Sequence, residues 1–325
     1  MSLRIAIPNA RGKSGASNFL NVLKRTILSS ELAKIRSPFN PFHDVALFSS
    51  VARNIHKKPY VLRLDGIYYD LKERYGSNKK LNYSIFESIN NANSIIFQSE
   101  FSKSLVQSHY GSLISSSEVI LNGIDIKEKN TCSENQKDKI SNKKIILCSA
   151  KWRGFKRLDA TIKTVDKLRK EINCELQIIG DTGGVNVNYN FVKCIGDVNH
   201  SEINNYLENA DLFLHLAWLD NCPNSVIEAI GARVPVVCSN IGGTREIIEA
   251  TQGGIVSMCD PNVDYSQLVD LHNPPKPNYD ILVSDIIKLF EDYGNIVNKL
   301  DTQAIDIRTT AIKYVDVLKR QINRN

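Results

Sequence analysis

The stretch that decides the fold is residues 217–246, AWLDNCPNSVIEAIGARVPVVCSNIGGTRE. An apolar strand ends just before it, at Leu216, and the chain then turns through Asp220 to Pro223. Proline suits the first position of a helix, because its φ is already helical and the N–H that it lacks would have no partner there. The pattern predicts a helix from Pro223 to about Ile230.

The first turn of this helix suggests an anion site. The amides of Asn224, Ser225 and Val226 lie in its first turn, where backbone N–H groups have no partner within the helix and can hold a phosphate. Two carboxylates frame the same turn, since Asp220 stands just ahead of the helix and Glu228 lies about one and a half turns into it.

The rest of the stretch repeats the same order of elements. Gly231 ends the helix, the buried strand 234–238 follows, and Gly242-Gly243 opens a second turn from strand to helix. Strands that alternate with helices are typical of parallel sheets in α/β proteins.

This alternation extends over the whole chain, as two series of apolar or β-branched runs with helical patterns between several of them. The runs lie at 3–7, 44–48, 60–64, 94–98 and 119–121 in the first series, and at 144–148, 175–179, 191–195, 211–216 and 234–238 in the second. We therefore expect an α/β protein with two doubly wound parallel sheets.

A polar segment, KEKNTCSENQKDKISNK at 127–143, separates the two series. It indicates a first domain at 1–124, a linker at 125–143 and a second domain at 144–310. The C-terminal helix at 311–325 is expected to return toward the first domain.

The composition is that of an ordinary soluble globular protein: 325 residues, 42% hydrophobic and 23% charged. We expect a cytoplasmic protein, because neither a signal peptide nor a run of 18 apolar residues is present. The seven cysteines are an odd number without Cys-x-x-Cys spacing, so buried free thiols are expected rather than disulfides or zinc. We expect no metal site and no cofactor.

The net charge of +6 is unevenly distributed. Residues 1–124 hold 16 Lys and Arg against 8 Asp and Glu, which gives +8, and the remainder holds 25 against 27, which gives −2. Pairs of cations in the first half, Lys24-Arg25, Lys57-Lys58 and Lys79-Lys80, could share a face. Such a face favours an anionic partner, and we expect peripheral contact with anionic membranes rather than nucleic acid.

The glycine loop after the first strand, NARGKSGASN at 9–18, contains the Gly-Lys-Ser that ends a nucleotide-triphosphate P-loop. That motif needs a glycine five positions before Gly12, where this chain has Ile7. The loop is therefore no P-loop, but Gly12 and Gly15 still allow backbone amides to approach an anion.

The block 217–246 resembles the carboxylate-bearing region of the retaining GT-B glycosyltransferases of family 4, the glycosyl transferases group 1. In that family two acidic residues, here Asp220 and Glu228, are separated by seven others. A small-Gly-x-x-Pro-Val-Val strand and a Gly-Gly-x-x-Glu turn follow, here at 231–237 and 242–246. Further pieces stand in family order: the glycine loop, FQSEFSKSLV at 97–106, LNGID at 121–125, SAKWRGFKRLD at 149–159, IIGD at 178–181 and IKYVDVL at 312–318.

The resemblance implies two Rossmann-like domains that face each other across a cleft, and a nucleotide-sugar donor bound without a metal. It implies that Glu228 holds the ribose hydroxyls and that Asp220 lies near the donor sugar. Lys151 and Lys156 match the family's pair of cations, with Arg153 as a competitor for the first role. The other donor-binding positions that it implies are Gly12, Gly15, Gly180, Asp181, Asn224, Ser225 and Val226.

The sequence departs from the family at three places. The first acidic residue is Asp220 where glutamate is commonest, which shortens its reach by one methylene. The N-terminal half is short, and the family's histidine after the third strand is absent. Asp65-Gly66 stands there instead, so Asp65 is a candidate contact for the donor or the acceptor, with a turn-forming Asp-Gly as the alternative.

The expected function is transfer of a sugar from a nucleotide sugar to a glycan or lipid-linked acceptor with retention of configuration, in bacterial surface-polysaccharide assembly. Two alternatives stay open. A nucleotide-sugar epimerase of the same fold would use water or an internal base in place of the acceptor. A non-catalytic homologue would bind the sugar nucleotide without cleaving it.

Overall fold

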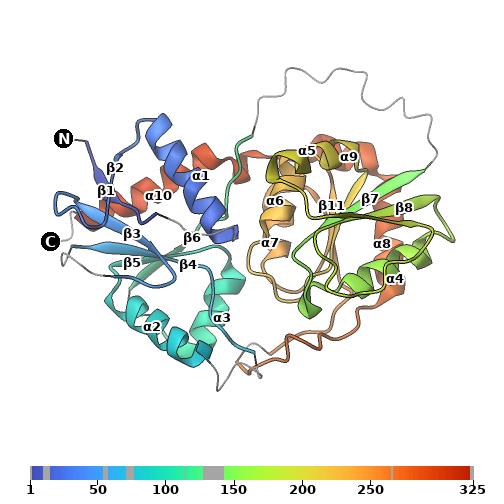
Figure 1. Ribbon diagram of the computed structural model, residues 1–325, viewed down its shortest axis with the longest axis horizontal. Coiled ribbons are helices and arrows are strands. Elements are labelled where there is room, and N and C mark those ends of the chain that lie inside the picture. The colour runs from blue at the N-terminus through green and yellow to red at the C-terminus, as the bar shows by residue number, and fades with distance from the viewer. Residues whose placement is uncertain are drawn as a thin grey trace. The chain divides into compact units, whose positions relative to one another are not determined.

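The computed structural model describes residues 2–9, 15–53, 58–70, 77–113, 115–126, 143–264 and 266–322. The chain forms two compact units. Unit 1 comprises 1–125, 264–270 and 303–325, and unit 2 comprises 126–263 and 271–302. Each unit contains a six-stranded parallel sheet with helices packed against it (Figure 1).

The sheet of unit 1 has the order β2-β1-β3-β4-β5-β6. Its strands are β1 (Arg4–Ala6), β2 (Lys34–Arg36), β3 (Val45–Ser49), β4 (Tyr60–Leu64), β5 (Ser94–Phe97) and β6 (Ser116–Val119). Its helices are α1 (Gly15–Ser29), α2 (Ser77–Asn91), α3 (Glu100–Tyr110) and α10 (Ile307–Ile322), with the 3-10 turn η3 (Gln303–Ile305).

The core of unit 1 joins the two ends of the chain. Helix α1 buries Phe19, Leu23 and Ile27, which are four residues apart and so form one apolar stripe. Helix α10 packs beside α1 and buries Tyr314, whose ring centroid lies 5.9 Å from that of Phe19. The C-terminal helix is therefore part of the unit 1 core.

The sheet of unit 2 has the order β12-β11-β10-β7-β8-β9. Its strands are β7 (Lys144–Ser149), β8 (Cys174–Ile179), β9 (Val192–Gly196), β10 (Leu212–His215), β11 (Val236–Ser239) and β12 (Gly254–Ser257). Its helices are α4 (Leu158–Leu168), α5 (His200–Asn209), α6 (Asn224–Gly231), α7 (Thr244–Thr251), α8 (Tyr279–Glu291) and α9 (Tyr293–Lys299), with the 3-10 turn η2 (Gly154–Lys156).

The fold class expected from the sequence is confirmed. Every predicted run overlaps a strand, and the sequence patterns missed two further strands, β2 and β12. Strand β2 reads Lys-Ile-Arg, at the sheet edge, and offers a single apolar residue. Strand β12 begins at Gly254, a residue type that is disfavoured in strands.

The unit boundaries differ from the expected domains at the C-terminal side. Unit 1 resumes at Gln303 and not at 311, because Ile305 and Ile307 are already buried in it. It also includes 264–270, which no sequence pattern indicated. Most of the expected linker at 125–143 lies outside the described residues.

Six cysteines are free thiols, and Cys132 lies outside the described residues. Five of the six are buried, as expected, but Cys194 is exposed on β9. In the part of the chain that the structure describes, no helix is both long enough and apolar enough to span a bilayer.

Candidate functional site

The candidate site lies at the carboxyl edge of the unit 2 sheet. The chain order reverses between the neighbouring strands β7 and β10, since β8 and β9 follow on one side and β11 and β12 on the other. Ligands of open α/β sheets bind outside the carboxyl ends of the strands at such a reversal. All six strands are parallel, so the loops after β7, β8, β10 and β11 leave the same edge.

An ion pair stands at the reversal point. The Lys156 ammonium, at the end of η2, contacts Oδ2 of Asp220, and each side chain is 18% exposed. The buried His215, the last residue of β10, places Nε2 3.4 Å from the same oxygen. One cation and one anion are therefore held, largely sheltered from solvent, between the loops after β7 and β10.

The electrostatics keep this pair charged. Burial alone would raise the pKa of Asp220, but the Lys156 ammonium and His215 outweigh it and hold that pKa well below its ordinary value. Burial lowers the pKa of His215 despite the neighbouring carboxylate, so the imidazole is neutral near pH 7.

The backbone around Asp220 leaves no room for larger residues. Leu219 has a φ of +60° and Gly242 a φ of +88°. A Cβ at Gly242 would lie 2.7 Å from the carbonyl oxygen of Asp220, and the amide of Gly243 donates to that oxygen at 2.7 Å. The Gly-Gly turn after β11 therefore packs directly against the backbone of Asp220. Only glycine fits at position 242.

Glu228 lies in the second turn of α6. It is half-buried, and burial raises its pKa to about 7. Asn224 and Ser225 occupy the first turn of α6, as expected. The expectation that the Val226 amide is free is wrong, because it donates to the carbonyl of Pro223 at 3.1 Å.

Gly180 and Asp181 form the turn after β8. Gly180 has a φ of +105°, and a Cβ there would lie 2.0 Å from the carbonyl oxygen of Ala150. The exposed Asp181 accepts from the amide of Gly183 at 3.0 Å. The glycine lets the loops after β7 and β8 touch, and the aspartate closes the turn.

The three cations of the loop after β7 have different surroundings. Lys156 alone is brought to Asp220, whereas the side chains of Lys151 and Arg153 are exposed. The carbonyl of Arg153 accepts from the amide of Lys156 at 2.8 Å, which shapes η2.

Sequence patterns missed a fourth charged residue of this loop, Arg157. Its guanidinium donates to both carboxylate oxygens of Asp260, at 2.8 and 2.9 Å, and both side chains are almost completely buried. The two residues are 103 positions apart, so no local pattern could pair them. The sequence alone showed only that a further arginine follows Lys156 directly, with nothing to indicate its burial or its partner.

In unit 1, Asp65 lies at the carboxyl edge of the sheet, after β4. Its carboxylate contacts the guanidinium of the buried Arg63 and accepts from Gln98 at 2.6 Å, from Ser49 at 2.7 Å and from Ser50 at 3.3 Å. These donors occupy the lone pairs of both carboxylate oxygens, so a substrate would have to displace one of them to bind Asp65.

The glycine loop is described only in part. Gly15 is the first residue of α1. Gly12 lies outside the described residues.

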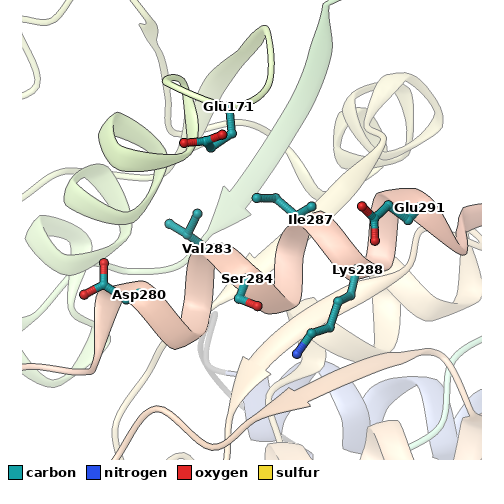
Figure 2. A pocket seen from close by; sticks show the side chains of 7 residues that line it. All are labelled: Glu171, Asp280, Val283, Ser284, Ile287, Lys288 and Glu291. Atoms are coloured by element: carbon teal, nitrogen blue, oxygen red, sulfur yellow. The ribbon is translucent and has the colours of Figure 1, made fainter.

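A separate shallow pocket of about 430 Å³ lies along α8 and contains none of the predicted site residues (Figure 2). It is lined by Glu171, Asp280, Val283, Ser284, Ile287, Lys288 and Glu291. Three carboxylates against one ammonium do not suit an anionic nucleotide.

Solved structures similar to this chain include the following three. Anabaena Alr3699/HepE in complex with UDP and glucose has a TM-score of 0.65 at 15% identity, covering 98% of this chain and 100% of that one. Sucrose-phosphate synthase from Thermosynechococcus elongatus has a TM-score of 0.74 at 11% identity, covering 99% and 100%. WaaG, a glycosyltransferase involved in lipopolysaccharide biosynthesis, has a TM-score of 0.65 at 15% identity, covering 97% and 99%.

Two curated relatives match over shorter segments. The putative teichuronic acid biosynthesis glycosyltransferase TuaC of Bacillus subtilis (strain 168) is 38% identical over 52 residues, which are 16% of this chain and 13% of that protein. Protein CapJ of Staphylococcus aureus is 28% identical over 120 residues, which are 34% of this chain and 31% of that protein. The matched segments thus span less than a third of each relative.

A sequence-family model matches the region that holds the site. Residues 131–272 match the family model described as Glycosyl transferases group 1. This segment includes the ion pair of Lys156 and Asp220, the helix with Glu228 and the Gly-Gly turn. Residues 131–272 therefore match the glycosyl transferases group 1 family, and the chain shares the two-unit GT-B fold of solved glycosyltransferases.

Proposed function

We propose that the protein is a glycosyltransferase that moves a sugar from a nucleotide-sugar donor to a glycan or lipid-linked acceptor. The observation that carries this proposal is the ion pair of Lys156 and Asp220 at the reversal point of the sheet, within the segment that matches group 1. A diphosphate leaving group needs a cation at this edge, and a donor sugar needs a polar partner beside it.

In the proposed reaction, the bond between the anomeric carbon and the donor's diphosphate oxygen breaks, and an acceptor hydroxyl oxygen takes its place on that carbon. The hydroxyl proton passes to an oxygen of the departing diphosphate, and the configuration of the sugar is retained. Negative charge grows on the departing diphosphate, so Lys156 stabilises the transition state more than the bound donor. Lys151, Arg153 and the first-turn amides of α6 add to this effect, and no metal ion is needed.

Glu228 is proposed to accept hydrogen bonds from the ribose of the donor. It lies about one turn of helix beyond Asn224 and Ser225 of the proposed phosphate site, and its side chain is half-buried. A similar structure was solved with UDP-glucose, and UDP-sugars are therefore the first donors to test.

The proposed pathway is the assembly of a bacterial surface polysaccharide. Support comes from relatives whose names include teichuronic acid and lipopolysaccharide biosynthesis. Unit 1 is proposed to receive the acceptor and to touch anionic membranes peripherally, since it carries most of the excess of positive charge.

Thermal melting of the protein with a panel of nucleotide sugars and free nucleotides tests the proposal. A donor at 100 times its dissociation constant adds about 2.7 kcal/mol to the free energy of unfolding. A selected donor is then incubated with the protein, and the products are identified. Stabilisation without cleavage would favour a non-catalytic binding protein, and conversion to an isomeric nucleotide sugar would favour the epimerase.

A further inference from the structure

The buried pair of Arg157 and Asp260 lies next to the proposed donor site but contacts none of the atoms assigned to the reaction. Two almost fully buried charges are an expensive way to stabilise a fold, because apolar residues of similar volume often serve as well. A role beyond stability would explain why they are present.

The backbone conformation of Arg157 also indicates a role beyond stability. Its φ of +54° is in the left-handed region, where a side chain costs energy and glycine does not. A left-handed residue also stands next to Asp220, the partner of Lys156: Leu219, directly before it, has a φ of +60°. Strain of this kind persists only where surrounding contacts enforce it, and it gathers at functional sites.

The enforcing contacts form a closed ring through four loops. Arg157 binds Asp260, which exchanges two backbone hydrogen bonds with the side chain of Asn240, at 3.0 and 3.1 Å. Two residues beyond Asn240, the Gly242-Gly243 turn packs against the backbone of Asp220. The Asp220 carboxylate closes the ring on Lys156, the residue before Arg157.

Two further contacts join the loops after β7 and β10 directly. The amide of Trp218 donates to the carbonyl of Phe155 at 2.7 Å, and the Arg157 guanidinium lies 5.9 Å from the centre of the Trp218 ring. The loops after β7 and β10 are thus tied by backbone as well as by side chains.

We infer that Arg157 and Asp260 are positioning residues, which hold the Lys156 ammonium and the Asp220 carboxylate in one geometry through this ring. The inference rests on the proposed function for its catalytic consequence. Its structural consequence, order in the loops 150–156 and 217–221, is independent of any ligand.

The double variant Arg157→Met/Asp260→Leu separates positioning from stability. It removes both buried charges together, fills most of their volume with apolar side chains and keeps the backbone groups of residue 260, so an unfolding midpoint near that of the wild type is expected. Arg157→Lys is the second variant, which keeps the charge but loses the two-point contact. The control is Lys167→Met on α4, the helix that follows Arg157; it breaks an exposed pair with Asp280 of α8.

Hydrogen exchange of the free proteins is the first measurement. We expect exchange in both 150–156 and 217–221 to be at least about tenfold faster in the double variant, and faster to a lesser degree in Arg157→Lys, with no change in the control. Faster exchange confined to the residues beside 157 and 260 would overturn the inference.

Turnover of UDP-glucose is the second measurement. Displacement of Lys156 predicts a fall in kcat of about 10²-fold with the donor KM nearly unchanged, even though the fold is intact. If Lys156→Ala is inactive and the double variant turns over like the wild type, positioning is overturned and the proposed function stands. If Lys156→Ala retains full turnover, the proposed function fails. Hydrogen exchange alone then tests whether Arg157 and Asp260 order the two loops.

Discussion

His215 Nε2 and the Lys156 ammonium converge on a single oxygen, Oδ2 of Asp220, with the imidazole nitrogen 3.4 Å away. The carboxylate is therefore shared between a neutral ring and a cation, at the edge where β7 and β10 end. This sharing accounts for the low pKa of Asp220 and makes the pair sensitive to acid.

Asp220→Asn is expected to destabilise the protein by about 1–3 kcal/mol at pH 7, between the values for exposed and buried ion pairs. Because the pKa of Asp220 is depressed in the folded protein, its contribution is fully present above the ordinary aspartate value and is lost as the pH falls below about 4. Urea unfolding of both proteins between pH 7 and pH 3 measures the difference. A difference that stays constant over this range contradicts the assignment.

Glu228→Gln is expected to stabilise the free protein at alkaline pH. The pKa of Glu228 is raised to about 7, so the unfolded chain releases its proton first and stability is lost as the pH rises from about 4.5 to about 7. The variant has no proton to lose and should exceed the wild type by about 1–3 kcal/mol at pH 8, with little difference at pH 4. Unfolding curves at both pH values test this, with the exposed Glu208→Gln as control; equal stability at pH 8 would rule out a buried acid.

Nucleotide binding is expected to release a proton from Glu228. Ribose hydroxyls donate to the charged carboxylate, so binding near pH 7 draws the group into its ionised form. Calorimetric titration with UDP in two buffers of different ionisation enthalpy counts the proton. Glu228→Gln should release none and bind more weakly, by roughly 1.5–3 kcal/mol for each charge-assisted bond lost. Identical affinity and proton release in the two proteins would remove Glu228 from the site.

Binding to anionic vesicles is expected to depend on the basic residues of unit 1. Lys58, Lys79 and Lys80 are exposed, and Lys57 lies outside the described residues. Each lysine near an anionic surface contributes about 1 kcal/mol, screened within roughly 8–10 Å at physiological salt. Charge reversal at these four positions should abolish sedimentation with anionic vesicles at low salt.

Charge reversal at Lys163, Lys170, Lys193 and Lys288, four exposed cations of unit 2, is the matched control for the vesicle experiment. It should leave sedimentation unchanged. Equal binding of the wild type to neutral and anionic vesicles would show that the charge serves another purpose.

Local sequence patterns predicted those parts of the fold that depend on neighbouring residues. The strand that ends before Asp220, the turn at Pro223 and the helix with Glu228 were all predicted in place, because turn chemistry and hydrophobic spacing are local signals. The ion pair of Lys156 with Asp220 was not predicted, although the loops that hold the two residues leave the same edge of the parallel sheet.

Long-range contacts could not be predicted in the same way. The buried pair of Arg157 and Asp260 joins residues from two loops, and an arginine after a basic loop normally suggests a solvated residue. Asp65 was a candidate substrate contact because it follows a strand. Its hydrogen-bond donors come from three neighbouring strands or their loops, so no local pattern could predict them. The packing of Ile305 and Ile307 moved the boundary of unit 1 for the same reason.

Cleavage of the donor selected by the melting screen, without acceptor, by the wild type and Lys156→Ala tests the central claim most directly. The account predicts slow hydrolysis by the wild type that first releases sugar of the donor's own anomeric configuration, seen by proton NMR, and that added EDTA does not change. Lys156→Ala should be slower by about 10²–10³-fold with a similar donor KM, whereas Lys163→Ala on α4 should match the wild type. Equal cleavage by Lys156→Ala and the wild type, or cleavage by neither protein with any nucleotide sugar, would contradict the account.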